Sequence, residues 1–382
     1  MSVRSYLYYL MAPKINMFPN LKQLARSANN DLKLIRHTAA EKFPQLIRPT
    51  TRIIDVAITS SCNLRCVGCR YGRDFMPNSQ LEWPMVRDLL DDAKELGIES
   101  IRLYGGEPLL HPDLPKMVEH CGKLQLSVWV TTNGILLKEK IDELYAAGLR
   151  RITIGLYGIG DVYDSYVQRK NRFAQLEESI VYIRERYGSE VMLRFNWLLM
   201  RPSCNVEALR EAFDFAEKYG AGLQVDQIHY SLPYFTEGPD RVLQFRPEDG
   251  PAIEKVVREL IRLKRARPDV LEATLRGLSS IPDWLLKGPE MRVPCDKYDY
   301  IWIGADGTVQ MCYVTFKLGN LHDTRFRDLL FTSEHQKAAN DSFALNCPNC
   351  HCGAFSRIET HLPSRRLYSR ELKRLSVGSS PN

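Results

Sequence analysis

Between residues 53 and 229 the chain repeats one pattern, a short apolar segment followed by a loop and then by an amphipathic stretch. The apolar segments are rich in Ile, Val, Leu and aromatic residues, which is typical of strands covered by helices. Consecutive strand–helix units produce parallel strands joined by right-handed crossovers. Six units are too few for a closed eight-stranded barrel, so the sequence predicts an α/β fold with a partial, TIM-like (β/α)6 barrel or an open sheet. The predicted strands are 53–59, 100–104, 126–132, 151–156, 191–200 and 223–230.

Helical signals fill the gaps between these strands. Pro84 suits the first turn of a helix that ends at Gly97. Asn205 is a candidate N-cap for a helix that ends before Gly220. Longer helices are predicted over 174–187 and 248–267. In a fold of this kind, the loops that follow the carboxyl ends of the strands build the functional site.

Beyond residue 294 the pattern changes to that of a smaller unit. Residues 300–303 and 308–313 are typical of a hairpin with Asp-Gly in its turn, and a short helix is predicted near 326–339. The sequence therefore predicts four parts. They are a basic N-terminal extension (1–50), a partial barrel (51–289), a small C-terminal α+β domain (290–360) and a basic tail (361–382).

The composition excludes several classes of protein. Of 382 residues, 44% are hydrophobic and 26% are charged, so the chain can bury an ordinary globular core. The apolar stretch at 5–13 is too short to span a membrane and lacks a cleavage site, so we expect a cytoplasmic protein without a transmembrane segment. Its residues 6–11 are expected to pack onto the barrel rather than to dock on a membrane surface. The basic ends favour solvated arms over contacts with an anionic partner.

Ten cysteines carry most of the chemical information. Two groups of three, separated by a long middle that contains Cys121 and Cys204, indicate soft-metal sites rather than disulfides. The first group, Cys62, Cys66 and Cys69, follows the first predicted strand with the spacing Cys-x3-Cys-x2-Cys. Three thiolates can hold a cubane iron–sulfur cluster and leave one iron open. Zinc would require a fourth ligand that this loop does not offer.

This loop resembles the cluster-binding loop of the radical S-adenosylmethionine (SAM) superfamily, and the resemblance extends to about residue 230. A Gly-Gly-Glu-Pro segment ends the second strand, where the family binds the amino group of SAM; two glycines permit close backbone approach and a carboxylate suits an ammonium group. A Thr-Thr-Asn segment ends the third strand and lines the same pocket in the family, and an arginine after the fourth strand approaches the SAM carboxylate. The corresponding residues are Gly105, Gly106, Glu107, Pro108, Thr131, Thr132, Asn133 and Arg169.

The resemblance also implies cofactors and a mechanism. A [4Fe–4S] cluster on the three cysteines would chelate SAM at its open iron and, once reduced, cleave the sulfonium to a 5′-deoxyadenosyl radical that abstracts hydrogen from a substrate. The protein would orient the reactants and exclude water. The electron is expected to come from a flavodoxin or a ferredoxin-type reductant.

The C-terminal cysteines resemble those of the shortened SPASM, or twitch, domain, which holds an auxiliary [4Fe–4S] cluster. The hairpin spacing Cys-x11-Gly-x4-Cys and a later Cys-x2-Cys pair fit this domain. The predicted ligands are Cys295, Cys312, Cys347 and Cys350. Full SPASM domains bind two clusters with more cysteines than remain here, so we expect one auxiliary cluster. Cys352 or His351 could replace one of these ligands, and structural zinc is the alternative metal.

Several other side chains are candidates for the site. Cys121 lies on the apolar face of a predicted helix and is assigned to the core. Cys204 follows the fifth strand, where its thiol could return a hydrogen atom to a substrate radical; it could equally be an unreactive loop thiol, and Cys352 is a rival donor. Candidate substrate contacts near the ends of strands five and six are Asn196, Asp226, His229 and Tyr230.

These features predict a small-molecule enzyme that resembles the twitch-bearing epimerases and dehydrogenases of antibiotic pathways. Its substrate would be carbohydrate-like, with hydrogen abstraction from a carbinol carbon. The spare thiol near the mouth favours epimerisation, with two-electron dehydrogenation as the alternative. A ribosomal-peptide maturase is a further alternative, and a zinc scaffold or nucleic-acid-binding module is disfavoured because it would leave the glycine-rich motifs without a role. We expect no nucleic-acid partner.

Overall fold

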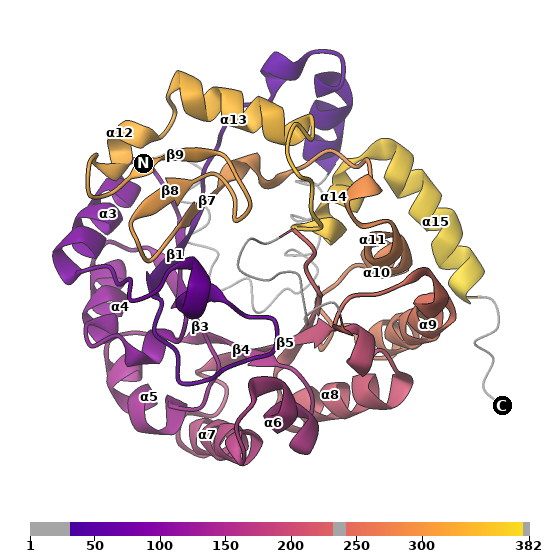
Figure 1. Cartoon of the computed structure of the whole chain (residues 1–382), viewed down its shortest axis with the longest axis horizontal. Coiled ribbons are helices and arrows are strands. Elements are labelled where there is room, and N and C mark those ends of the chain that lie inside the picture. The colour runs from indigo at the N-terminus through magenta and orange to yellow at the C-terminus, as the bar shows by residue number, and fades with distance from the viewer. Residues whose placement is uncertain (1–30, 232–241, 377–382) are drawn as a thin grey trace.

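The computed structural model describes residues 31–231 and 242–376, and its strands form one nine-stranded sheet. The sheet runs in the order β6-β5-β4-β3-β2-β1-β7-β8-β9, and β1 to β6 are parallel. Figure 1 shows the helices as an outer ring around these strands. The six parallel strands are β1 (Ile53–Thr59), β2 (Ser100–Gly105), β3 (Ser127–Thr132), β4 (Arg151–Leu156), β5 (Met192–Leu199) and β6 (Gly222–Gln227). The predicted partial barrel is confirmed, with each strand within three residues of its predicted limits.

The helices that follow these strands cover the outer side of the sheet. They are α3 (Trp83–Glu95), α4 (Leu114–Lys123), α5 (Leu137–Ala146), α6 (Asp161–Val167), α7 (Arg172–Tyr187), α8 (Val206–Lys218) and α9 (Gly250–Ala266). Apolar strand residues such as Ile54, Val56 and Ile58 are fully buried in the core between the two layers. The predicted N-cap is confirmed, because the Asn205 side chain accepts a hydrogen bond of 2.7 Å from the amide of Ala208.

The C-terminal hairpin extends the sheet of the barrel rather than forming a separate one. Strand β7 (Tyr300–Ile303) pairs in parallel with β1, and β8 (Thr308–Gln310) returns antiparallel to β7. A further strand that was not predicted, β9 (Lys317–Asn320), completes the edge. The turn requires glycine at Gly307, whose φ is +80° and whose added Cβ would lie 2.7 Å from Asn320 Oδ1.

The remaining helices follow α9 in the chain. They are α10 (Leu275–Ser279), α11 (Ile281–Lys287), α12 (Phe326–Leu329), α13 (Ser333–Phe343), α14 (Ala354–Thr360) and α15 (Leu362–Ser376). The single helix predicted near 326–339 is therefore two helices. Short helical turns are η2 (Pro44–Leu46), the π-turn η3 (Tyr71–Phe75), η4 (Pro108–Leu110), η5 (Arg201–Ser203), η7 (Pro247–Asp249), η8 (Gly288–Glu290) and η9 (Lys297–Asp299). No described helix has both the length and the apolar character needed to cross a membrane.

Most of the predicted basic tail is a packed helix and not a solvated arm. Helix α15 contacts α9, α10 and α14, and it buries Tyr368 and Leu375. Arg374 Nη1 lies 3.0 Å from Glu254 Oε1, and the hydroxyl of Tyr368 donates a 2.7 Å hydrogen bond to Asp283. An apolar face combined with a complementary charged edge explains why the segment docks despite its basic composition.

The described part of the N-terminal extension also docks. Residues 31–40 form a helix whose His37 Nε2 lies 2.8 Å from the hydroxyl of Tyr298, and Ala40 and Ile47 pack in a small cluster with Phe343 of α13. The predicted packing of residues 6–11 concerns a segment outside the described residues.

This docking surface should weaken in acid. Burial lowers the pKa of His37 and of His335, in α13, to about 4 from 6.5. Between pH 6.5 and about 4, these histidines bind protons in the unfolded chain but not in the folded chain. Their contribution to the free energy of unfolding is therefore fully present above pH 6.5 and is lost as the pH falls toward 4. We expect a loss of up to about 3 kcal/mol per histidine, measured by urea unfolding. The H37L/H335L variant should lose less over this range; an equal loss would contradict the assignment.

Candidate active site and auxiliary metal centre

The first three cysteines lie in a loop directly after β1, at the carboxyl edge of the sheet. Amide Val67 N donates a 2.9 Å hydrogen bond to the carbonyl of Tyr166, and Arg65 N donates one of 3.2 Å to that of Val167. These bonds hold the loop against the end of α6. The thiols of Cys62, Cys66 and Cys69 are close enough to influence one another electrostatically, and burial raises the pKa of the Cys66 thiol. Binding of a metal cluster to this loop would therefore release protons.

Two glycines allow the end of β2 to approach this loop closely. Gly106 N donates a 2.7 Å hydrogen bond to Thr59 O, and Glu107 N donates one of 2.7 Å to Ser61 O. A Cβ added to Gly105 would lie 2.1 Å from Thr59 O, and one added to Gly106 would lie 2.3 Å from Ser61 O. The predicted close backbone approach therefore exists, and it occurs between β2 and the start of the cysteine loop.

The Glu107 carboxylate joins the ends of β2 and β3 from inside the protein. It is fully buried and accepts hydrogen bonds from Thr132 Oγ1 at 2.6 Å, from Asn133 N at 2.8 Å and from Leu109 N at 3.0 Å. Burial raises its pKa to about 7, opposed by these three donors. Both oxygens accept hydrogen bonds from the protein's own donors, and the pairing of this carboxylate with the ammonium group of SAM stays a prediction.

The third motif contacts the cysteine loop as well. The Asn133 side-chain amide donates a 2.7 Å hydrogen bond to Asn63 Oδ1, inside the loop. Arg169 lies two residues beyond Val167, whose carbonyl holds the loop, and its guanidinium donates to the carbonyl of Gln168 at 2.9 Å. The structure thus gathers the cysteine loop and the three predicted SAM-binding segments at one edge of the sheet.

The inner side of the barrel is polar and accessible. Along β4, β5 and β6, every second residue is buried against the helices, and the residues between them are mostly half-buried on the inner side. Asn196 on β5 donates a 2.6 Å hydrogen bond to Asp226 Oδ2 on β6, and Gln224 donates one of 3.2 Å to Asp226 Oδ1. The Asn196 Oδ1 atom is buried and has no hydrogen-bond partner. Two of the four predicted substrate contacts therefore form one polar pair.

The C-terminal cysteines gather into a second site. The buried thiol of Cys352 is influenced by the thiols of Cys350, Cys312 and Cys295. Cys347, by contrast, is influenced by one cysteine, Cys350, among the residues that the structure describes. The Cys352 thiol thus lies beside that of Cys350, and the choice between Cys347 and Cys352 as the fourth ligand stays a prediction.

The other two predicted substrate contacts belong to this second site. His229 Nε2 lies 3.1 Å from Cys352 Sγ. One ring nitrogen of His229 and the sulfur atoms of Cys350 and Cys352 all lie within 4.8 Å of one another. The ring of Tyr230 packs edge-on against that of His351 at 4.8 Å. His351 itself lies 3.2 Å from the carbonyl of Gln227 and not among the thiols. His229 and Tyr230 therefore lie beside the C-terminal cysteine segment.

Comparison with known proteins agrees with both sites. Residues 56–216 match the radical SAM superfamily, and residues 295–352 match SPASM, an iron-sulfur cluster-binding domain. The chain carries a radical SAM domain and a SPASM domain. Such domains hold [4Fe–4S] clusters and bind SAM, and the two cysteine sites fit these cofactors in ligand type and number.

Curated relatives align with less than half of this chain. A GTP 3′,8-cyclase from Aquifex aeolicus (strain VF5) is 33% identical over 148 residues, covering 37% of this chain and 46% of the relative. A probable GTP 3′,8-cyclase from Methanococcus maripaludis (strain C6 / ATCC BAA-1332) is 31% identical over 176 residues, covering 46% and 58%. The chain thus spans about half the length of the curated relatives that it matches.

Solved structures share the fold over most of the chain. Native anSMEcpe with bound AdoMet superposes with a TM-score of 0.60 at 15% identity, covering 85% of this chain and 96% of that one. Streptococcus suis SuiB bound to the precursor peptide SuiA gives a TM-score of 0.61 at 16% identity, covering 87% and 76%. At this level of identity the likeness concerns the fold.

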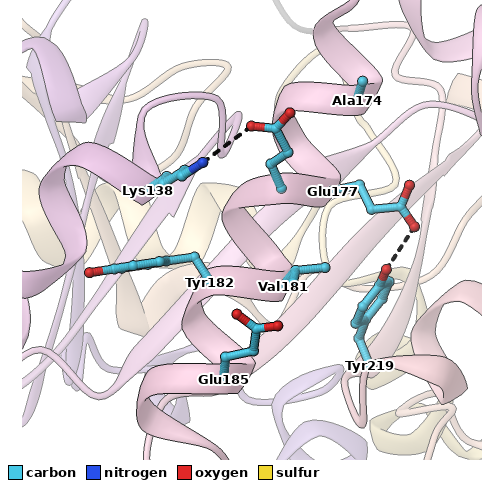
Figure 2. Close-up of a pocket in the computed structure, with 8 residues that line it drawn as sticks. Lys138, Ala174, Glu177, Val181, Tyr182, Glu185 and Tyr219 are labelled. Atoms are coloured by element: carbon cyan, nitrogen blue, oxygen red, sulfur yellow. Dashed lines mark hydrogen bonds and ion pairs between the residues drawn. The ribbon is translucent and has the colours of Figure 1, made fainter.

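Two cysteines remain apart from both sites of the radical SAM and SPASM domains. Cys121 is buried in the core, as predicted. Cys204 packs half-buried against the same core, and the charged group that influences it is Asp249. The surface groove of Figure 2, between α5 and α7, contains none of the motif residues; its Lys138 and Glu178 form an ion pair of 3.4 Å.

Sequence analysis missed a polar network inside the radical SAM barrel. Arg102 Nη1 on β2 lies 2.6 Å from Asp55 Oδ2 on β1 and donates a 3.0 Å hydrogen bond to the hydroxyl of Tyr313. Tyr313 directly follows Cys312 and also bonds to Asp55, so the network ties the auxiliary site to the barrel. The sequence did contain a signal for this network, because Asp55 and Arg102 are opposite charges within two apolar strands and occupy paired positions in the sheet.

Replacement of Glu107 should weaken SAM binding without removing the auxiliary cluster. In E107A three buried donors lose their acceptor, each at a cost of about 1–3 kcal/mol. We expect at least a tenfold loss of SAM affinity by calorimetry, with the auxiliary iron content unchanged. The exposed Glu99 provides the control E99Q, which should behave as the wild type. Unchanged affinity in E107A would contradict the role of this carboxylate.

The choice of auxiliary ligand can be tested by iron analysis. In a chain whose first three cysteines are replaced by alanine, C352S should lose the remaining cluster because a core ligand is removed. C347S should retain it, since Cys352 and not Cys347 groups with Cys350 and His229 among the described residues. Iron and sulfide content and the visible absorption of the anaerobic proteins measure the difference, and the reverse result would restore Cys347 as the ligand.

Proposed function

We propose that this chain is a radical SAM enzyme that oxidises a polar, sugar-like small molecule at a carbinol carbon. The observation that carries the proposal is the polar inner face of the barrel, where Asn196 and Asp226 form a pair beneath the edge that holds the SAM motifs. Side chains of this kind suit a substrate with several hydroxyl groups, since buried amide and carboxylate groups require hydrogen-bonding partners. The unpartnered Asn196 Oδ1 is an acceptor for one such hydroxyl.

The residues of the chain have distinct roles in this proposal. Cys62, Cys66 and Cys69 would hold the first cluster, and with SAM bound this site would supply the radical chemistry that removes one hydrogen atom from the substrate. The Asn196–Asp226 pair holds the carbinol, and Asp226 accepts the hydroxyl proton. The C-terminal cysteines would hold a cluster able to accept the remaining electron, so that loss of a hydrogen atom, a proton and an electron would leave a carbonyl group. Half-buried apolar residues around the cysteine loop, Val67 among them, limit access of water.

Dehydrogenation is preferred to epimerisation because the candidate hydrogen donors lie elsewhere. Cys204 packs against the core, and among the described residues Cys352 lies beside Cys350 and His229 rather than in contact with the polar pair. Epimerisation with Cys204 as donor remains the alternative reaction. Solvent deuterium at one product carbon, absent in C204S, would support that alternative, whereas a ketone from both proteins would support dehydrogenation.

A purine nucleotide is the second candidate substrate, favoured by the names of the curated relatives. Those alignments cover at most about half of this chain, so they support the SAM chemistry more than the substrate. A peptide substrate draws support from the fold likeness to SuiB alone. Incubation with cyclitols and aminosugars, with GTP and with short peptides separates the three classes.

The proposal is tested by anaerobic turnover with SAM and dithionite. We expect 5′-deoxyadenosine from the wild type, and a ketone product in the presence of a polyhydroxylated substrate. D226N should lower ketone formation at least tenfold, because the proton acceptor is lost, while substrate-independent SAM cleavage continues. The control D214N, on the outer helix α8, should retain full activity. Product formation from GTP alone would overturn the assignment of substrate class.

A further inference from the structure

Arg357, in α14, is a fully buried guanidinium with no acidic partner among the described residues. A buried charge is usually paired with an opposite charge, as Glu359 on the same helix is with Arg276 at 2.5 Å. Burying a charge without a counter-charge costs several kcal/mol, so an unpaired buried guanidinium requires compensation from another source. Neither the SAM motifs nor the polar pair in the barrel involves this residue.

The guanidinium is held between the two segments that carry the auxiliary cysteines. It donates hydrogen bonds to the carbonyls of Cys350 at 2.5 Å and of Pro294 at 3.3 Å, and another to that of Val293. It also stands 4.8 Å from the centre of the Trp284 ring. These contacts orient the group next to Cys295 and Cys350 and leave it little freedom to move.

The presumed ligands lie directly beside this group. Arg357 donates a hydrogen bond to the backbone of Cys350 itself and another to that of Pro294, which precedes Cys295. The other charges near the site, those of Asp296 and Lys297, have opposite signs and oppose one another. Arg357 therefore contributes the net positive charge beside a set of thiolates.

We propose that Arg357 is the fixed counter-charge of the auxiliary cluster and raises its reduction potential. This inference rests on the proposed function, in which the SPASM domain holds one cluster that accepts an electron. One-electron reduction adds a negative charge to the cluster, and a buried cation stabilises that reduced form. The oxidised cluster thereby becomes a better acceptor for the electron that the substrate loses.

The test is a mediated redox titration of the auxiliary cluster, followed by electron paramagnetic resonance. The chain carries alanine at its first three cysteines so that one cluster contributes the signal. Removing the charge in R357Q and R357M should favour the oxidised form at least tenfold, a shift of about 59 mV to more negative potential. R357K, which keeps the charge, should stay closer to the parent. The paired control R276Q/E359Q removes one charge of each sign nearby and should leave the potential unchanged.

The outcomes separate this inference from the proposed function. Absence of a cluster in the parent chain would refute the proposed function. A cluster whose potential is the same in the parent, R357Q and R357M would refute the role of Arg357 alone. Should both neutral variants lose the cluster, N349D replaces them, because it places a carboxylate beside the guanidinium at the position of Asn349 Oδ1, 3.4 Å away. An unchanged potential in N349D would equally overturn the proposal.

Discussion

The parallel pairing of β7 with β1 is the constraint on which both sites depend. Strand β1 lies between β2 and β7, so the cysteine loop at its carboxyl end adjoins the Gly-Gly-Glu segment on one side and the C-terminal hairpin on the other. The hairpin leads directly into Cys312, and Tyr313 bonds to Asp55 on β1. Backbone hydrogen bonds of one continuous sheet therefore set the arrangement of two cysteine groups that lie more than two hundred residues apart.

Buried charges then organise each site. Glu107 joins two strand ends to the first cysteine loop, and Arg357 joins two segments of the auxiliary loop. Each group satisfies backbone donors or acceptors that would otherwise be costly to bury. Arg102, paired with Asp55, performs the same task in the barrel between them. Stability and function therefore depend on the same few ionisable side chains.

Much of the radical SAM domain could be predicted from local patterns. The period of apolar residues located all six parallel strands, and the cysteine spacing predicted two cluster-binding sites. Local sequence patterns did not predict the segments whose packing depends on partners far away in the sequence. Helix α15 reads as a basic tail because its acidic partners, such as Glu254, lie more than one hundred residues away. Strand β9 is short and half-buried, so it has no strong alternation to detect.

The sequence by itself determined the chemistry: three thiols in a tight loop, two glycines that no other residue could replace, and a second set of thiols for an auxiliary centre. Only the tertiary structure decided which of these groups lie close to one another. It placed Cys352 beside Cys350 and His229, and it paired Asn196 with Asp226 in the barrel. The physical reason is that ligand type follows from local composition, whereas proximity follows from packing between segments that are distant along the chain.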